Sequence, residues 1–145
     1  MTLIKYLKLV LFFTGLLFWS TTILAQVKKS QFEVDEQLDY CLRQARKALN
    51  EIPHNGTIPR MIVGDTKEWV MVKPADWTSG FFPGILWYLY EYSKDNFWRK
   101  EAEKFTGLLK PLSEQPAFDH DLGFQIFCSY GNGYRLTKDT AYRNV

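Results

Sequence analysis

The stretch "ADWTSGFFPGILWYLYEYSKD" (residues 75–95) returns in altered form as "FDHDLGFQIFCSYGNGYRLTKD" (residues 118–139). Within these stretches, "DWTSGF" (76–81) aligns with "DHDLGF" (119–124) at an offset of 43 residues. A period in this range is typical of stacked helix pairs, because one pair alone cannot bury its apolar face. The sequence therefore predicts two copies of a helical unit.

The first copy has the pattern of an apolar helix followed by an amphipathic one. Aromatic and aliphatic residues occupy nearly every position from Gly80 to Tyr92, which is typical of a helix buried on all sides. The next helix is expected to begin at Ser93 or Asp95, and it carries apolar residues on one side and charged residues on the other. Pro111 stops it after Leu109. We therefore expect an inner helix, opened by an aspartate-containing loop, and then an outer helix.

The second copy repeats this order. Its apolar helix is expected to begin near Asp121 and to end where Gly131 can adopt the left-handed conformation after a helix. The segment "TKD" (137–139) aligns with "SKD" (93–95) at an offset of 44 and opens another outer helix, which stops after a few residues at Val145. The sequence thus predicts an all-α array that is truncated relative to its architecture. Aromatic surface on the inner helices should then stay partly uncovered, for instance at Trp87, Tyr90 and Phe127.

Two further segments precede the copies. Residues 31–50 carry apolar residues at three- and four-residue intervals behind a capping box that begins at Ser30, and they predict an amphipathic helix. Residues 52–74 are rich in proline and glycine, with a short β-like run at 69–72. They predict a long ordered loop, a feature that is often functional in a compact domain. Asn55-Gly56-Thr57 matches a glycosylation acceptor, but Asn-Gly is also a turn signal, which we favour.

Residues 1–25 predict a secretory signal peptide. Lys5 and Lys8 form a short basic region, an uncharged run follows, and Ala25 is a small residue suited to cleavage. The alternative is a membrane anchor, but the uncharged run from Leu9 to Val27 has 19 residues, barely enough to span a bilayer. We expect cleavage after Ala25, an exported protein in the periplasm or outside the cell, and no membrane association afterwards. Residues 26–145 would then form one portion of a domain.

The charge balance argues against nucleic acid and anionic lipid as partners, and the cysteine spacing argues against a metal site or a disulfide framework. The chain has 18 basic and 16 acidic residues, and the two sets balance once Lys5 and Lys8 are removed. A neutral chain produces no field that would attract nucleic acid or anionic lipid. Cys41 and Cys128 have neither the spacing of a metal site nor that of a disulfide framework. Two buried free thiols and a single disulfide in an oxidising compartment both remain open. We expect no metal and no cofactor.

Polar and aromatic residues fall directly before each expected inner helix. Asp76 and Trp77 precede the first, and Asp119, His120 and Asp121 precede the second. Stacking of the units should bring both loops to the same end of the array and into one cleft. Exposed N–H groups and the helix dipole favour the charged form of a carboxylate at a helix N-terminus. Asp121 is therefore the strongest candidate for an acting anion, with His120 and Trp77 beside it. The alternative is that Asp121 is only an N-cap.

The segments "ADWTSGFFPGILWYLYEYSKD" and "DHDLGFQIFCSYGNGYRLT" resemble the two N-terminal signature segments of the unsaturated glucuronyl hydrolases, glycoside hydrolase family 88. The resemblance covers about residues 33–145. It implies an α/α toroid of six helical hairpins, of which this sequence holds only the N-terminal ones. It also implies that Asp121 is one of two essential aspartates that act on bound substrate, that Trp77 lines the sugar site, and that His120 contacts substrate.

The substrate that the resemblance implies is an oligosaccharide with a 4,5-unsaturated uronic acid at its non-reducing end, as polysaccharide lyases produce. A carboxylic acid protonates C4, water adds at C5, and the hemiketal opens with loss of the remaining sugar. Ordinary glycosidases protonate the leaving oxygen instead. The family's second aspartate, its proton donor, belongs to a later hairpin that this sequence does not contain. We therefore expect no measurable hydrolysis by the 145-residue chain itself.

Three alternatives remain at this point. The first is an unsaturated rhamnogalacturonyl hydrolase with the same toroid, although the segment from Asp119 to Phe124 favours the glucuronyl group. The second is a non-catalytic helical-repeat module that binds carbohydrate, which an assay for loss of the enol's ultraviolet absorbance would separate from an enzyme. The third is an inactive fragment of an enzyme gene, which sequencing past the codon for Val145 would reveal.

Overall fold

The computed structural model describes residues 33–116 and 120–145. The predicted signal peptide, residues 1–25, and the candidate Asp119 lie outside the described residues. Within the described part of the chain, no helix combines the length and the apolarity that a membrane crossing requires.

The chain forms two compact units, Met1–Tyr40 and Cys41–Val145. In the first unit, residues 33–40 are helical, as the apolar spacing predicts, while the predicted capping box begins at Ser30, outside the described residues. In the second unit, residues 41–51 are helical and bring Leu49 to the core. All the elements named below belong to the second unit.

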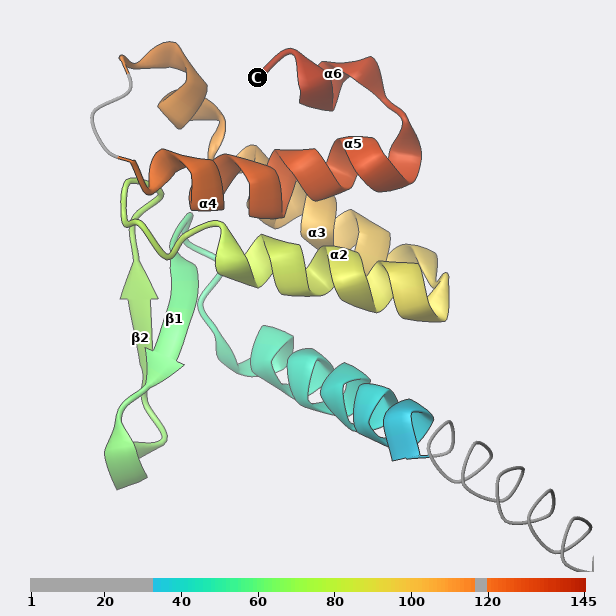
Figure 1. The fold of residues 1–145 in the computed structure, drawn as a ribbon. Coiled ribbons are helices and arrows are strands. Elements are labelled where there is room, and N and C mark those ends of the chain that lie inside the picture. The colour runs from blue at the N-terminus through green and yellow to red at the C-terminus, as the bar shows by residue number, and fades with distance from the viewer. Residues whose placement is uncertain (1–32, 117–119) are drawn as a thin grey trace, which may run out of the picture. The chain divides into compact units, whose positions relative to one another are not determined.

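An antiparallel hairpin follows this helical segment. Its strands are β1 (Ile58–Ile62) and β2 (Trp69–Val72), and a 3-10 turn, Gly64–Thr66, lies between them. Ile58 pairs with Val72, and the register shifts once along the ladder. Figure 1 shows the hairpin beside the start of α2 (Phe81–Ser93), which places it close to the candidate residues of the first repeat.

The expectation of one long loop from residue 52 to residue 74 is wrong for β1. The β-like run at 69–72 is indeed β2, but the pattern of β1 gave no strand signal. Ile58 and Pro59 are buried while the three residues after them are exposed, so the strand lacks the alternation of a half-buried strand. A proline inside a short run also argues against a strand.

The rest of the unit is helical, and its helices follow the order that the repeat predicts. In chain order they are α2, α3 (Asn96–Gly107), a 3-10 segment (Lys110–Glu114), α4 (Leu122–Ile126), a π-helical turn (Phe127–Gly131), α5 (Asn132–Thr137) and α6 (Thr140–Arg143). Helices α4 and α5 with the π turn between them form one continuous helix. It runs beside α2 in the same direction, as Figure 1 shows. The two expected inner helices are therefore parallel.

Both inner helices end, and both outer helices begin, with the same local structure. Lys94 and Lys138 adopt the left-handed conformation, with φ of 56° and 61°, and the N–H group of each donates to the carbonyl four residues earlier at 2.8 Å. Asp95 and Asp139 then act as N-caps, each accepting from the backbone N–H group two residues later at 2.9 Å. This local identity supports the repeat that the sequence predicted.

The π turn explains why the offset grows from 43 to 44 along the repeat. A π turn holds one residue more than an α-turn, so the second inner helix is one residue longer than α2 between matched positions. The expectation that Gly131 ends this helix is wrong: Gly131 has a helical φ of −58°. The helix continues past Gly133, where an added Cβ would lie 3.1 Å from the rings of both Trp87 and Tyr142, and it ends only at Lys138.

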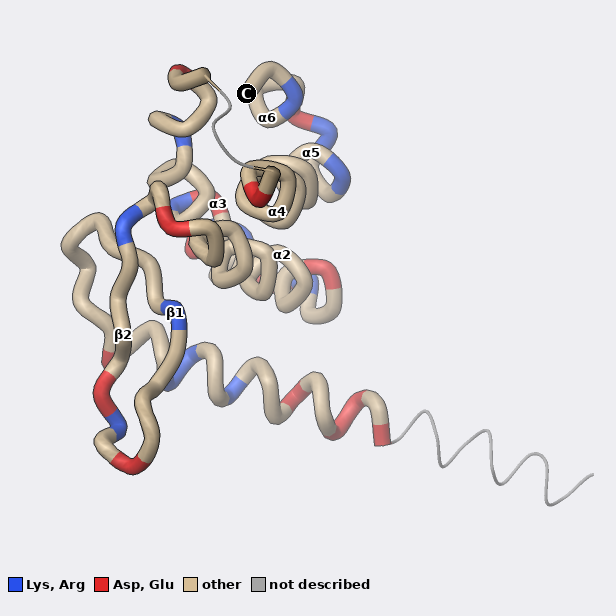
Figure 2. The backbone as a smooth tube through the Cα atoms, turned by 60° about the vertical axis from the view of Figure 1, so that its left-hand side comes forward, with Lys and Arg blue, Asp and Glu red and all other residues tan. Residues whose placement is uncertain are grey.

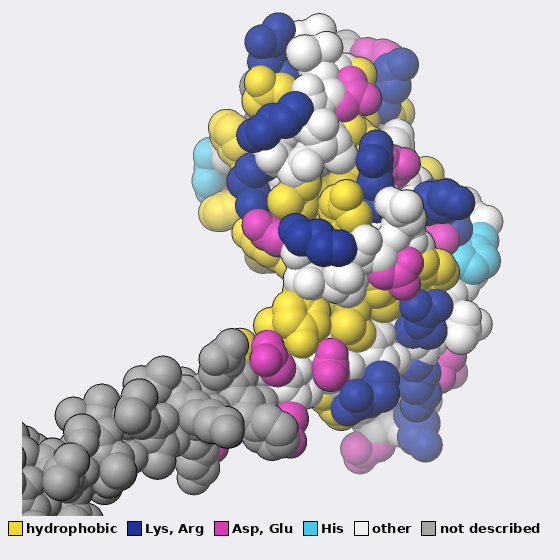
Figure 3. All heavy atoms as spheres, turned by 90° about the vertical axis from the view of Figure 1, so that its right-hand side faces the viewer, with side chains coloured by type: hydrophobic (Ala, Val, Ile, Leu, Met, Phe, Trp, Pro, Cys, Tyr) yellow, Lys and Arg dark blue, Asp and Glu magenta, His cyan; other side chains and the backbone are white. Residues whose placement is uncertain are grey.

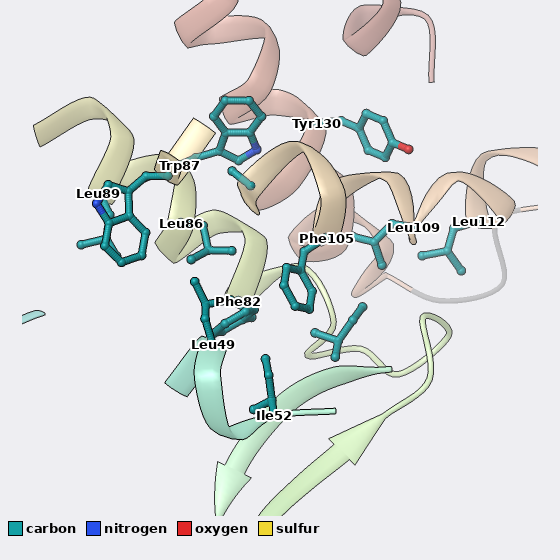
Figure 4. Packing of buried hydrophobic residues seen from close by; sticks show 13 residues of the cluster. Leu49, Ile52, Phe82, Leu86, Trp87, Leu89, Phe105, Leu109, Leu112 and Tyr130 are labelled. Atoms are coloured by element: carbon teal, nitrogen blue, oxygen red, sulfur yellow. The ribbon is translucent and has the colours of Figure 1, made fainter. Parts of the chain in front are cut away.

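The core is centred on α2 and α3 and includes residues before them, such as Leu49, and after them, such as Leu112 and Tyr130 (Figure 4). Phe82 of α2 meets Phe105 of α3 edge to face, with ring centroids 4.9 Å apart. Trp87 is fully buried, and its indole N–H donates to the Thr106 hydroxyl at 3.0 Å. Leu49 extends the same cluster toward the hairpin. The amphipathic spacing of α3 thus turns its apolar side onto α2, as expected for an outer helix.

The prediction of uncovered aromatic surface is only partly right. Trp87 is buried, because Tyr142 and Thr106 cover it, and for this residue the prediction is wrong. Tyr90 is partly buried and Phe127 is 76% exposed. The sequence could not separate these cases, because nearly all positions of the inner helices are apolar and only packing decides which are covered.

Candidate functional site

The loops that open the two inner helices lie at the same end of the second unit, as the sequence predicted. Figure 2 brings the starts of α2 and α4 toward the viewer. The segment Pro74–Gly80, called the Trp77 loop below, precedes α2, and His120 and Asp121 precede α4. The side chain of Gln125 in α4 donates to backbone carbonyls of the Trp77 loop at 2.8 and 3.1 Å. The Trp77 loop is therefore in contact with α4.

Asp76 organises the Trp77 loop. Its Oδ1 accepts from the Thr78 backbone N–H at 2.9 Å and from the Thr78 hydroxyl at 2.5 Å, while Arg60 of β1 approaches Oδ2 to 3.3 Å. Burial alone would raise the pKa of Asp76, but the hydrogen bonds from Thr78 and the charge of Arg60 outweigh it and lower this pKa below its ordinary value. The carboxylate is thus held as an anion.

Trp77 carries the exposed aromatic surface of this loop. Its side chain is 46% exposed, and its ring meets Phe81 edge to face at a centroid distance of 5.9 Å. The Arg60 guanidinium lies 5.9 Å from the centroid of the indole ring. Trp77 lines a largely apolar groove of about 570 Å³, which is bounded by the helical residues 41–51, the hairpin and α2. An indole beside a cation is suited to stacking on a sugar ring.

Asp121 stands at the N-cap position of α4, where it was predicted. Its backbone carbonyl accepts from the N–H groups of Phe124 and Gln125 at 2.9 and 3.3 Å, but its side chain makes no capping hydrogen bond. The alternative role of a simple side-chain N-cap therefore lacks support. The carboxylate is 24% exposed, and His120 Nε2 lies 3.5 Å from its Oδ1. The His120 side chain itself is 90% exposed.

The structure brings His120 and Asp121 together and places Trp77 on the loop that contacts their helix. Neither His120 nor Asp121 lines the groove that contains Trp77, so a shared cavity for the three stays a prediction. Among the residues that the structure describes, no three histidine, cysteine or acidic side chains are grouped closely enough to hold a metal ion. Cys41 and Cys128 are free thiols, and burial raises the pKa of the Cys128 thiol.

The opposite end of the inner helices has a different character. Figure 3 looks onto that end, where basic and acidic side chains are interspersed with hydrophobic ones. Arg135 of α5 and Glu91 of α2 form a bidentate ion pair there, with both N–O distances at 2.6 Å. The Arg135 hydrogen bonds lower the pKa of Glu91. Such paired charges cross-link the two inner helices, and they form no field of a single sign.

Sequence reasoning missed two residues that organise the site, Arg60 and Gln125. Arg60 belongs to the undetected strand β1, so nothing tied it to the Trp77 loop. Gln125 could have been found, since it is a polar residue in an apolar helix and aligns with Phe82 of the first copy. A buried amide in such a helix needs partners, and the structure shows these in the Trp77 loop.

Comparison with known proteins gives a consistent result. No family model matches the chain. An unsaturated glucuronyl hydrolase of Formosa agariphila is 31% identical over 137 residues, which cover 94% of this chain and 34% of the relative. An unsaturated chondroitin disaccharide hydrolase of Streptococcus agalactiae is 29% identical over 112 residues, covering 76% of this chain and 27% of that protein.

Solved structures of the same enzymes share the fold. The crystal structure of an unsaturated glucuronyl hydrolase specific for heparin matches with a TM-score of 0.66 at 38% identity, over 74% of this chain and 28% of that one. The Streptococcus agalactiae glucuronyl hydrolase matches with the same TM-score at 27% identity, over 77% of this chain and 30% of its own. These structures are α/α toroids, so the predicted fold class is confirmed.

The chain spans 34% and 27% of the length of these two curated relatives. The match includes the repeated helical hairpins and both loops that carry the candidate residues. By sequence and by fold, the chain is a relative of the unsaturated glucuronyl hydrolases of glycoside hydrolase family 88 and corresponds to their N-terminal part.

Proposed function

We propose that this chain forms part of the active site of an enzyme that removes a 4,5-unsaturated uronic acid from the non-reducing end of lyase-generated oligosaccharides. One observation carries the proposal: a carboxylate, Asp121, begins an inner helix at the same end of the fold as an exposed tryptophan, Trp77. The names of the relatives, glucuronyl hydrolase and chondroitin disaccharide hydrolase, support the substrate class. None of the relatives reported above favours the rhamnogalacturonyl alternative.

In the proposed reaction, a carboxylic acid donates a proton to C4 of the enol ether, and positive charge develops toward C5. Water adds at C5 and releases a proton, and the hemiketal opens so that the sugar at the leaving position departs. Asp121 suits the role of the anion that stabilises this charge or orients the water, because the N–H groups and dipole of its helix favour a carboxylate there. The proton donor would be a second carboxylic acid with a raised pKa.

Trp77 and His120 suit the binding of the sugar. The exposed indole offers a flat apolar face against which a pyranose ring can stack. The imidazole of His120 lies beside Asp121 and is open to solvent, so it can reach hydroxyl or carboxylate oxygens of a ligand. The hydration described above needs only groups that donate, accept or stabilise charge, so the proposal includes no metal or cofactor.

Export belongs to the same proposal. A signal peptide in residues 1–25 would deliver the protein to the compartment in which polysaccharide lyases release their products. The mass of the protein purified from its native host tests this step, because cleavage after Ala25 leaves Gln26 as the first residue. A protein that retains Met1 would contradict it.

The catalytic test uses the 145-residue chain and, in parallel, the product of the whole reading frame that encodes it. Both are incubated with unsaturated disaccharides made by chondroitin and heparin lyases, and the loss of ultraviolet absorbance is followed. In the form that turns over, Asp121→Asn should lower kcat a few hundredfold, about 3 kcal/mol of transition-state stabilisation, with KM nearly unchanged. Asp139→Asn makes the same chemical change at the N-cap of α6 and serves as the control. Unchanged turnover in Asp121→Asn would assign Asp121 a purely structural role.

A further inference from the structure

Gln125 is a buried amide whose side chain points away from its own helix. It is 2% exposed and lies one helical turn after Asp121. Its Nε2 atom lies 2.8 Å from Asp76 O, 3.1 Å from Pro74 O and 3.1 Å from Ser79 Oγ. The two carbonyls can only accept, so the group that faces them is the NH2 of the amide. The two N–H groups of the amide therefore serve three acceptors of the Trp77 loop, and one of the groups is shared between two of them.

The loop side of Gln125 offers a matching acceptor for its amide. The Ser79 hydroxyl, itself fully buried, donates to Pro74 O at 2.8 Å and is thus free to accept from the amide. The buried hydroxyl of Ser129 donates to the backbone carbonyl of Gln125 at 2.5 Å, a bond within the helix that does not involve the amide. A Cβ at Gly80 would lie 2.5 Å from Gln125 Cα, so the two backbones are already in contact. The backbone of α4 at Gln125 is therefore packed directly against the start of α2.

The Trp77 loop depends on this amide. Its internal bonds are short-range turns, such as Ser79 N–H to Asp76 O at 3.0 Å. A second side-chain link, the Arg60–Asp76 pair, is partly exposed to water, where ion pairs stabilise little. The amide itself is buried, and its loss would remove one of the two hydrogen bonds that the carbonyls of Pro74 and Asp76 each accept, since Ser79 supplies the other in both cases. Asp76 and Ser79 flank Trp77, so the contacts of Gln125 determine where the indole stands.

We propose that Gln125 is a positioning residue, which ties the Trp77 loop to the helix that carries Asp121. Because Gln125 and Asp121 are one turn apart on one helix, the amide sets the distance between the indole of Trp77 and the carboxylate of Asp121. This role rests on the proposed function in one respect, namely that Trp77 and Asp121 act on the same sugar. The tie between loop and helix does not depend on it.

The test compares Gln125→Met, which keeps the length of the side chain but has no donor, with Ser129→Ala, which removes another buried polar group of the same helix that does not touch the loop. The protein is labelled with 5-fluorotryptophan, and the Trp77 signal is assigned by its loss in Trp77→Phe. We expect Gln125→Met to shift the Trp77 signal and to speed amide exchange of Ser79 and Phe81 at least tenfold relative to α3. Ser129→Ala should leave both readouts unchanged.

A milder variant covers the case in which Gln125→Met does not fold. Ser79→Ala removes one acceptor of the amide from the loop side and should move the same Trp77 signal in the same direction by a smaller amount. Unchanged Trp77 signals in a folded Gln125→Met, or equal shifts in Ser129→Ala, would overturn the proposal.

Titration with the unsaturated disaccharide from chondroitin lyase separates this proposal from the proposed function. If Gln125 positions the binding residue, Gln125→Met should weaken binding about tenfold, while Ser129→Ala binds as the unmodified protein does. If no form binds the disaccharide, yet Gln125→Met still moves Trp77, the proposed function fails and the tie between loop and helix stands. Wild-type affinity in a Gln125→Met protein whose Trp77 signal has moved would refute the positioning role.

Discussion

The starts of α2 and α4 carry the same glycine-phenylalanine pair but differ in what surrounds the glycine. A Cβ added at Gly80 would lie 2.5 Å from Gln125 Cα, whereas one added at Gly123 would meet no atom of the described residues within 4 Å. Neither glycine has a positive φ. Glycine at Gly80 is therefore required by the neighbouring inner helix and not by its own backbone. The repeated motif records a contact between successive helices, and only the first copy shows that contact.

Among the substitutions that test this comparison, replacement of Gly80 by alanine should change the stability of the protein most. The clashing atoms belong to the backbone of Gln125, which cannot swing aside, so we expect the free energy of unfolding to fall by about 3 kcal/mol, the upper range for overpacking. Denaturant unfolding measures this directly. A loss below about 1 kcal/mol would show that α2 and α4 can separate at little cost.

The second-largest effect is expected at the two N-cap aspartates, one in each repeat, whose replacement should lower stability by different amounts. Asp95→Ala removes the cap of α3, which buries four of its side chains, and it should lower the free energy of unfolding by about 1 kcal/mol. Asp139→Ala removes an identical cap from α6, a four-residue helix with no fully buried residue. We expect a global loss several times smaller, with faster amide exchange confined to α6. Equal global losses would contradict the view that only α3 is part of the cooperative core.

Gly123→Ala should act in the opposite sense to Gly80→Ala. Gly123 lies in the first turn of α4 with open space around it, and alanine restricts the unfolded chain and favours the helix, so a gain of about 0.5 kcal/mol is expected. Thermal unfolding of the 145-residue chain provides the measurement. If Gly123→Ala proves as costly as Gly80→Ala, some part of the protein must press against Gly123 in solution.

The smallest effect concerns pH. The pKa of Asp76 is lowered in the folded protein, so its ionised form stabilises folding fully above its ordinary pKa of 3.8, and the stabilisation is lost as pH falls through the lower folded value. Asp76→Asn keeps an acceptor for Thr78 but removes the charge that pairs with Arg60. Its stability deficit at neutral pH, on the order of 0.5 kcal/mol, should therefore shrink below pH 3.8. The same substitution at the exposed Asp65, Asp65→Asn, is the control. If the stability deficit of Asp76→Asn does not change with pH, the ion pair with Arg60 does not contribute to stability.

Much of the fold could be predicted because the same pattern of an inner and an outer helix occurs twice in the sequence. The helix order, the parallel inner helices and the outer helix α3 all follow from apolar spacing and from the matched segments. The hairpin was only half predicted, since β1 contains Pro59 and shows no alternation. The end of α5 was misplaced because a glycine such as Gly131 commonly ends a helix. The helix ends instead at Lys138, which has a left-handed φ, and a lysine in the sequence gives no indication of that conformation.

The candidate site was predicted less completely than the fold. The helix start at Asp121 and the shared end of both loops follow from the dipole argument and from stacking. The partners of the loop do not, since Arg60 and Gln125 act across 16 and 49 residues of sequence. Local patterns report periodicity and capping, whereas contacts over such separations depend on how the helices pack.

The π turn between α4 and α5 has a consequence for how such a repeat can vary in length. An extra residue inside an ordinary α-helix would turn everything after it by about 100°. The turn at Phe127–Gly131 absorbs that residue locally, so Gln125 still faces the Trp77 loop while Gly133 still faces Trp87 and Tyr142. The middle of an inner helix is thus a place where an ancestral gene could gain or lose a codon without disturbing either end. Comparisons of related chains should find their length differences there more readily than at the lysine-aspartate junctions.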